Sequence, residues 1–184
     1  MRILFVTTTG LALNPRLAKE LLLAKEAGFR VSLICFKMNN WSDAISKELM
    51  KERITGDLIE INATRENLVL WLTTSFIHMI VKKLPSKWLW VNGLAVHKWS
   101  IAILFHLIFI KNKFDIIIGH NLGSLYPCYF YSFYKNIPFV FDVEDYHPGE
   151  KILQGNIEEE KKRRDYCMAN TLVYANAITF AASN

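Results

Sequence analysis

Cysteine is scarce in this sequence, with three residues among 184. Cys35, Cys128 and Cys167 are odd in number, and none has the CxxC or CxxH spacing of zinc sites and redox pairs. We therefore expect buried free thiols in a reducing environment, not a disulfide framework. A secretory signal pattern is missing as well, because Met1 and Arg2 lead directly into a short apolar run, so we expect a cytoplasmic location.

The glycine-rich motifs that hold nucleotide phosphates are also absent. A dinucleotide-binding fold would show GxGxxG in its first loop and an acidic residue after its second strand, whereas here Gly10 stands alone and the second strand runs into Lys37. No GxxxxGK segment follows a predicted strand, and GxSxG does not occur. These absences disfavour an NAD or FAD enzyme, a P-loop nucleotidase and a simple serine hydrolase. We predict no bound cofactor.

Dense basic patches and membrane-spanning runs are missing too. The net charge is +5, but lysine and arginine are scattered through the sequence, so we expect no nucleic-acid partner. Between Arg65 and Lys113 lie two apolar segments, whose longer run has about 16 residues against the roughly 20 that a helix needs to cross a bilayer. We predict two crossover helices there, packed on a sheet and on each other.

A second interpretation of this region stays open. Aromatic rings and basic residues together favour the surface of an anionic membrane. The residues that would form such a surface are Trp71, Phe76, Ile77, Lys82, Lys83, Lys87, Trp88 and Trp90.

The rest of the chain alternates short apolar runs with amphipathic segments. Strands are predicted at Ile3 to Val6, Arg30 to Phe36, Gly56 to Asn62, Phe114 to Gly119, Pro138 to Asp142 and Ala177 to Ala181. Helices are predicted from Pro15, capped by Asn14, to Gly28, and at Asp43 to Arg53, Leu122 to Tyr134 and about Ile157 to Tyr174. This rhythm predicts an α/β domain over residues 1–184 with a doubly wound, mainly parallel, Rossmann-like sheet.

Polar residues gather where these strands end. If the strand order is the common 3-2-1-4-5-6, the first and fourth strands are neighbours, and ligands are expected in the crevice between the loops that follow them. The first loop holds Gly10, Asn14 and Arg16, and the loop after the fourth strand opens with His120 and Asn121. A guanidinium at a helix N-terminus suits a phosphate or a sugar carboxylate, although a surface arginine is also common.

A third polar cluster follows the fifth strand. It contains Asp142, Glu144, Asp145, His147 and Glu150. Such a loop can serve as an acid/base site, a metal site or a solvated surface, and we predict no metal because no regular spacing fixes a coordination geometry.

Four segments in order resemble the N-terminal domain of GT-B glycosyltransferases of family 4, the glycogen-synthase-like group. The matching positions are Asn14, Pro15, Arg16, His120, Asn121, Asp142, Asp145, Pro148 and Ser183. Glu144 and His147 depart from the pattern, since basic and aromatic residues are common there in that family.

The resemblance implies that this chain is the N-terminal, acceptor-side half of a GT-B enzyme. A nucleotide-sugar would be held mainly by a second domain, and a sugar would pass to a glycan or lipid-linked acceptor with retention of configuration and without a metal. His120 would be catalytic, and the substrate-binding residues would be Gly10, Asn14, Arg16, Asn121, Asp142 and Asp145. The enzyme would act in polysaccharide biosynthesis on the inner face of the membrane. The alternative is a non-catalytic α/β module that docks on a membrane or a protein partner.

Overall fold

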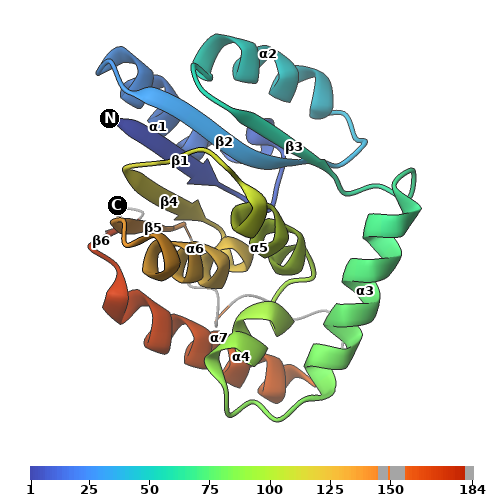
Figure 1. Ribbon diagram of the computed structural model, residues 1–184. Helices are drawn as coiled ribbons and strands as arrows, with labels where there is room; N and C mark the ends of the chain where they lie inside the picture. Colours follow the sequence, from blue (N-terminus) through green and yellow to red (C-terminus); the bar gives the residue numbers. More distant parts are fainter. Residues whose placement is uncertain (145–148, 150–155, 181–184) are drawn as a thin grey trace.

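Six parallel strands form one sheet in the order β3-β2-β1-β4-β5-β6 (Figure 1). The structure is a computed structural model that describes residues 1–144, 149 and 156–180. The strands are β1 (Arg2–Val6), β2 (Arg30–Lys37), β3 (Leu58–Asn62), β4 (Ile116–His120), β5 (Phe139–Val143) and β6 (Ala177–Phe180). The α-helices are α1 (Pro15–Glu26), α2 (Asp43–Arg53), α3 (Leu68–Lys83), α4 (Leu89–Ala95), α5 (Trp99–Phe109), α6 (Leu122–Lys135) and α7 (Ile157–Thr171), and short 3-10 turns occur at η1 (Leu11–Leu13) and η3 (Leu172–Tyr174).

This order confirms the predicted doubly wound, Rossmann-like fold. Phe5 of β1 is in register with Leu33 of β2 on one side and with Ile118 of β4 on the other. The chain winds outward from β1 to β3, returns to β4 and then winds outward in the opposite direction to β6. The switch between the two directions therefore lies between β1 and β4, where α/β sheets bind ligands.

Helices cover both faces of the sheet (Figure 1). Ile3 and Phe5 of β1 pack with α1 and α2, whereas Leu4 and Val6, which point the other way, pack with α5 and α6. Because neither face is open to water, the inner strands are continuous apolar runs. The three cysteines are buried and free, as predicted.

The prediction of two crossover helices between Arg65 and Lys113 is wrong, because the structure has three. Helices α4 and α5 meet at a bend of 116°. Helix α5 buries Trp99 and Ile103 on the sheet, while α4 turns away to cross α6 at Gly93. A Cβ at Gly93 would lie 2.3 Å from Cβ of Tyr126, so this approach requires glycine.

In the part of the chain that the structure describes, no single helix is both long and apolar enough to cross a bilayer. The bent pair α4 and α5 has sufficient length and hydropathy only when both helices are taken together.

We predict that Leu21→Ala, which empties a fully buried position of α1, lowers the free energy of unfolding by about 2–5 kcal/mol. Leu23→Ala is the matched control, because Leu23 is 54% exposed on the same helix, and it should change that free energy by less than about 0.5 kcal/mol. Urea unfolding followed by circular dichroism measures both. Equal losses would contradict the placement of α1 against the sheet.

Candidate functional site

The loops after β1 and β4 are joined through the side chain of Asn121. Its Oδ1 accepts a hydrogen bond from Thr7 Oγ1 at 2.5 Å and from the Thr8 backbone N–H at 3.3 Å, and its Nδ2 donates to Glu144 Oε2 at 2.9 Å. The backbone of Asn121 has φ 67° and ψ 148°, a conformation that residues other than glycine rarely adopt. The side-chain bonds hold this conformation and fix three strand ends to one another.

Helix α1 begins at the same edge of the sheet and contacts the end of β5. Asn14 caps the helix, because its Oδ1 accepts from the Leu17 N–H at 2.9 Å, as predicted. The amide nitrogen of Asn14 donates to Glu144 Oε1, and the Arg16 guanidinium donates to Asp142 Oδ1. The first turn of α1 is thereby coupled to two acidic side chains of β5 and its loop.

His120, the last residue of β4, is fully buried and faces three carboxylates. Its Nδ1 lies 3.1 Å from Glu144 Oε1 and 3.4 Å from Asp142 Oδ2, and its Nε2 lies 3.2 Å from Glu20 Oε2. Nε2 has no aligned hydrogen-bond partner among the described residues, so its attraction to Glu20 is mainly between charges. Asp142 also accepts from Thr179 Oγ1 of β6 at 2.5 Å.

These contacts set the charge of the cluster. Burial by itself would lower the pKa of His120, but the three carboxylates, Asp142 first, outweigh it and raise the pKa to about 10. Burial acts to raise the pKa of Asp142, whereas hydrogen bonds from His120 and β6 and the charge of Arg16 lower it overall. At neutral pH an imidazolium and a guanidinium therefore face three carboxylates, which leaves an excess of negative charge.

This charge state decides what the site can do chemically. A protonated His120 is a poor general base at neutral pH, but it is a hydrogen-bond donor and a fixed positive charge. The side chains of Arg16 and Glu20 are 34% and 32% exposed, so a ligand meets them first. Because carboxylate oxygens outnumber the cations, the site favours ligands rich in hydroxyl donors over a free phosphate.

The structure brings five of the predicted site residues into this cluster: Asn14, Arg16, His120, Asn121 and Asp142. Gly10 lies elsewhere, because a Cβ there would meet Phe36 O and Ser46 Oγ, both at 3.3 Å, on the side of β2 and α2. Asp145 lies outside the described residues. Contact of these residues with a substrate stays a prediction.

The sequence analysis missed two parts of the cluster. Glu20 follows Arg16 by four residues and therefore lies on the same face of α1, a spacing that could have identified it. Thr179, on β6, has no comparable signal in the sequence. Glu144 was named as a member of the polar loop after the fifth strand and as a departure from the family pattern, but not as a site residue, yet it contacts Asn14, His120 and Asn121.

One ligand atom from each of His120, Asp142 and Glu144 lies within 4.8 Å of the others, a spacing compatible with a bound metal ion. Imidazole and carboxylate are common metal ligands. Here Arg16 already pairs with Asp142, and a metal would have to displace the proton that the carboxylates hold on His120. The geometry fits an ion-pair cluster better than a metal centre, and the absence of a metal stays a prediction.

Comparisons with known proteins give a general likeness only. No protein-family model and no curated protein sequence matches the chain. Among solved structures, the chain is similar to MurG of Acinetobacter baumannii (14% identity, 100% of this chain and 42% of that chain, TM-score 0.44). It is also similar to the glycosyltransferase VinC in complex with dTDP (13% identity, 97% of this chain and 46% of that chain, TM-score 0.44). A third similar structure is a UDP-N-acetylglucosamine 2-epimerase (15% identity, 97% of this chain and 41% of that chain, TM-score 0.45).

The chain spans less than half the length of each of these three structures. At TM-scores below 0.5 the likeness is remote, so the strand order, not the neighbours, defines the fold class.

We predict that the folded protein loses stability as the pH rises from about 7 to 10. The pKa of His120 is about 10 in the folded state and about 6.5 when exposed, so its contribution is complete below pH 6.5 and is lost as the pH passes through 10. Urea unfolding at pH 7, 8, 9 and 9.5 measures this loss.

Glu20→Gln provides the comparison, because it removes one of the carboxylates that hold the proton on His120. In this variant the folded-state pKa of His120 should be lower, so the loss of stability above pH 6.5 should be smaller and should end at lower pH than in the wild type. Glu26→Gln changes an exposed carboxylate of the same helix and should reproduce the wild-type profile. Identical profiles for all three proteins would show that the charge on His120 does not depend on Glu20.

Proposed function

We propose that this chain forms the acceptor-side domain of a glycosyltransferase that uses a nucleotide-sugar donor. The observation that carries the proposal is the cluster of carboxylate and amide groups at the carboxyl ends of β1, β4 and β5. Sugar hydroxyls are hydrogen-bond donors, and Glu20, Asp142 and Glu144 supply acceptor oxygens at the position where doubly wound sheets bind ligands. The ordered segments that resemble family 4 of the GT-B enzymes support the same assignment.

In this proposal His120 stabilises charge and does not abstract a proton. Its pKa of about 10 keeps both ring nitrogens protonated at neutral pH. Nε2 is reached when the partly exposed Glu20 moves off the ring and a substrate oxygen takes its place. The Nε2–H then donates to that oxygen and opposes negative charge that develops on it.

Arg16 has a positioning role in the same cluster. Its pairing with Asp142 fixes the carboxylate beside His120, and its partly exposed guanidinium donates to an oxygen of the bound sugar. Donor binding by a second domain, retention of configuration, independence from metal and a glycan or lipid-linked acceptor follow from the family resemblance and complete the proposal.

The second candidate is a non-catalytic α/β module. The observation that favours it is the complete burial of His120, both of whose ring nitrogens face carboxylates. In this alternative the cluster has a purely structural role and holds the strand ends together. Activity measurements on surface-accessible members of the cluster separate the two candidates.

We predict that Arg16→Ala lowers turnover by about 10²–10³-fold in the active protein that contains this chain, the scale for the loss of one positioned polar group. The assay is transfer of radiolabelled sugar from a panel of nucleotide-sugars to a membrane lipid extract, with and without EDTA. Arg30→Ala is the control, because Arg30 is exposed at the first position of β2, whereas the cluster lies at the carboxyl ends of the strands. This variant should retain full activity. Circular dichroism confirms that each variant is folded.

Near-full activity in a folded Arg16→Ala protein would remove Arg16 from the site. The chain of residues 1–184 alone is expected to show no transfer, because the donor is held mainly by the second domain. Transfer by that chain alone would contradict the division of roles, and loss of activity in EDTA would contradict the metal-free mechanism.

A further inference from the structure

Helix α3 leaves one apolar face uncovered. Of its 16 residues only Thr74 and Val81 are buried. Its large exposed apolar side chains have exposures from 43% to 78%, and they are Leu68, Val69, Leu72, Phe76, Met79 and Ile80. The spacing of these positions, mostly three or four residues, places them in one stripe along the helix.

The exposed stripe differs from the membrane surface expected from the sequence. Trp71 is only partly exposed, because the Lys98 ammonium lies 4.8 Å and the Arg65 guanidinium 5.5 Å from its ring. Ile77 packs on the small core formed with α4. Three apolar residues of α3 were predicted for the membrane surface, and of these only Phe76, which is 60% exposed, belongs to the stripe.

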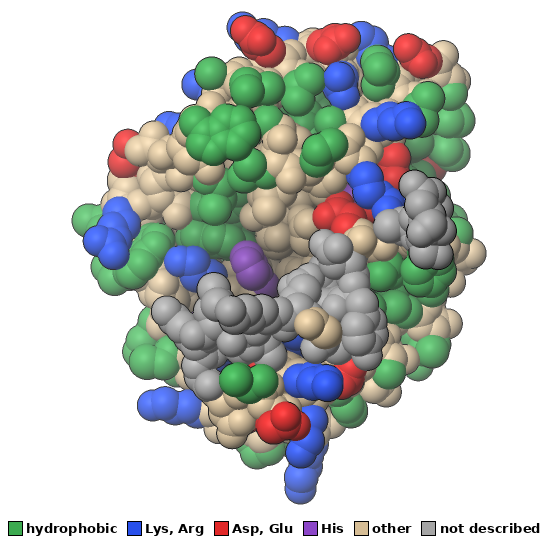
Figure 2. Space-filling view, turned by 180° about the vertical axis from the view of Figure 1, so that it is seen from behind, with side chains coloured by type: hydrophobic (Ala, Val, Ile, Leu, Met, Phe, Trp, Pro, Cys, Tyr) green, Lys and Arg blue, Asp and Glu red, His purple; other side chains and the backbone are tan. Residues whose placement is uncertain are grey.

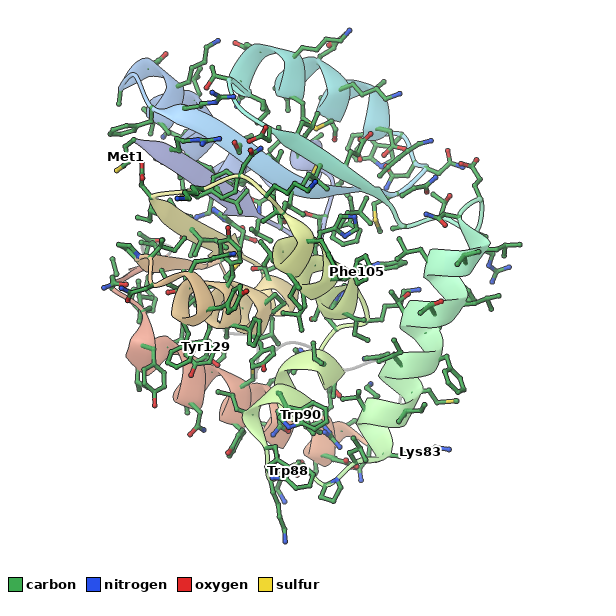
Figure 3. The ribbon with its side chains drawn as sticks, in the orientation of Figure 1. Met1, Lys83, Trp88, Trp90, Phe105 and Tyr129 are labelled. Carbon is green, nitrogen blue, oxygen red and sulfur yellow. The ribbon has the colours of Figure 1, made fainter. Side chains whose placement is uncertain are left out.

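The charged residues of the segment from Leu68 to Trp90 are all basic, since the segment contains no aspartate or glutamate. Lys82 is paired at 3.5 Å with Glu160 of α7, whereas Lys83 and Lys87 are exposed, and Figure 3 shows Lys83 projecting outward from the end of α3. Hydrophobic and basic side chains also lie side by side along the left of Figure 2, the side on which α3 lies.

Two tryptophans lie close to this basic end. Trp88 and Trp90 are 50% and 42% exposed, and their rings stack with centroids 6.2 Å apart. Figure 3 shows both at the end of the molecule formed by α4 and by the loop that leads from α3. Exposed indole rings beside lysines are typical of segments at the level of lipid head groups.

We propose that α3 docks on an anionic lipid bilayer, with its apolar stripe among the acyl chains and with Lys83, Lys87 and the two tryptophans at the head groups. The combination of an apolar helix face, lysines and tryptophans is that of an interfacial helix. A second copy of the chain would present the same excess of positive charge to this face, whereas anionic lipid supplies the opposite charge. The inference does not depend on the proposed sugar transfer.

Co-sedimentation with vesicles tests this proposal. The chain should bind vesicles that contain phosphatidylglycerol at low salt and should bind pure phosphatidylcholine vesicles at least tenfold more weakly, in line with the attraction expected for exposed lysines. Binding should also shift the tryptophan emission of the chain to shorter wavelength, because Trp88 and Trp90 leave water on docking.

Two pairs of variants separate this face from the rest of the surface. The double variants Leu72→Gln with Phe76→Gln, and Lys83→Glu with Lys87→Glu, should each lower vesicle affinity at least tenfold. Their controls are Phe133→Gln, which changes an aromatic residue of α6 that is 80% exposed, and Lys111→Glu with Lys113→Glu, which changes exposed lysines elsewhere. The controls should retain wild-type affinity. All changed residues are exposed, and circular dichroism checks that the variants fold.

Absence of binding to anionic vesicles at low salt would overturn the proposal. So would equal losses in the controls and in the α3 variants, because binding would then not depend on this face of the molecule. A dimer in light scattering that the Leu72→Gln and Phe76→Gln changes dissociate, without vesicle binding by the wild type, would assign this face to a second copy instead.

Discussion

The ion cluster around His120 is the interaction on which the carboxyl edge of the sheet depends. It ties α1, β4, β5 and β6 together, because Glu20, Asp142 and Glu144 share one buried imidazolium and Asp142 also binds Arg16 and Thr179. Removal of the imidazolium of His120 would leave the buried carboxylate of Asp142 without its nearest buried cation, a change that typically costs about 3–5 kcal/mol. Structure and chemistry are therefore inseparable at this site, and the partly exposed Glu20 and Arg16 are its points of access.

The winding of the sheet explains where both candidate surfaces lie. Because the chain reverses direction between β1 and β4, the loops that follow these two strands diverge at the edge of the sheet where the cluster lies, which is where doubly wound sheets bind ligands. Three helices, α3, α4 and α5, connect the edge strand β3 to β4. Of these, α5 packs on the sheet beside α6. Helix α3 packs outside that layer, which leaves its apolar stripe for another partner (Figure 1).

The fold was predictable because the strands are continuous apolar runs and the helices carry clear end signals, such as the cap at Asn14. The crossover region was harder, since the sequence does not show that α4 must turn to cross α6 at Gly93. For the site, strand ends identified His120 and Asp142, but Glu20 lies on a helix and Thr179 on an edge strand. Glu20 reaches His120 from 100 residues away along the chain, and Thr179 reaches Asp142 from 37 residues away. The spacing of Glu20 from Arg16 on α1 is the one local signal for either residue.

The protonation state of His120 tests this account most directly. Nitrogen NMR of the selectively labelled histidine ring, assigned with His120→Gln, measures it from pH 6 to 10.5. The account predicts that both ring nitrogens remain protonated through pH 8 and that the ring titrates near pH 10, as the carboxylates of Asp142, Glu144 and Glu20 require. Titration near pH 6.5 would show that the three carboxylates do not hold the proton, and the proposed organisation of the site would be wrong.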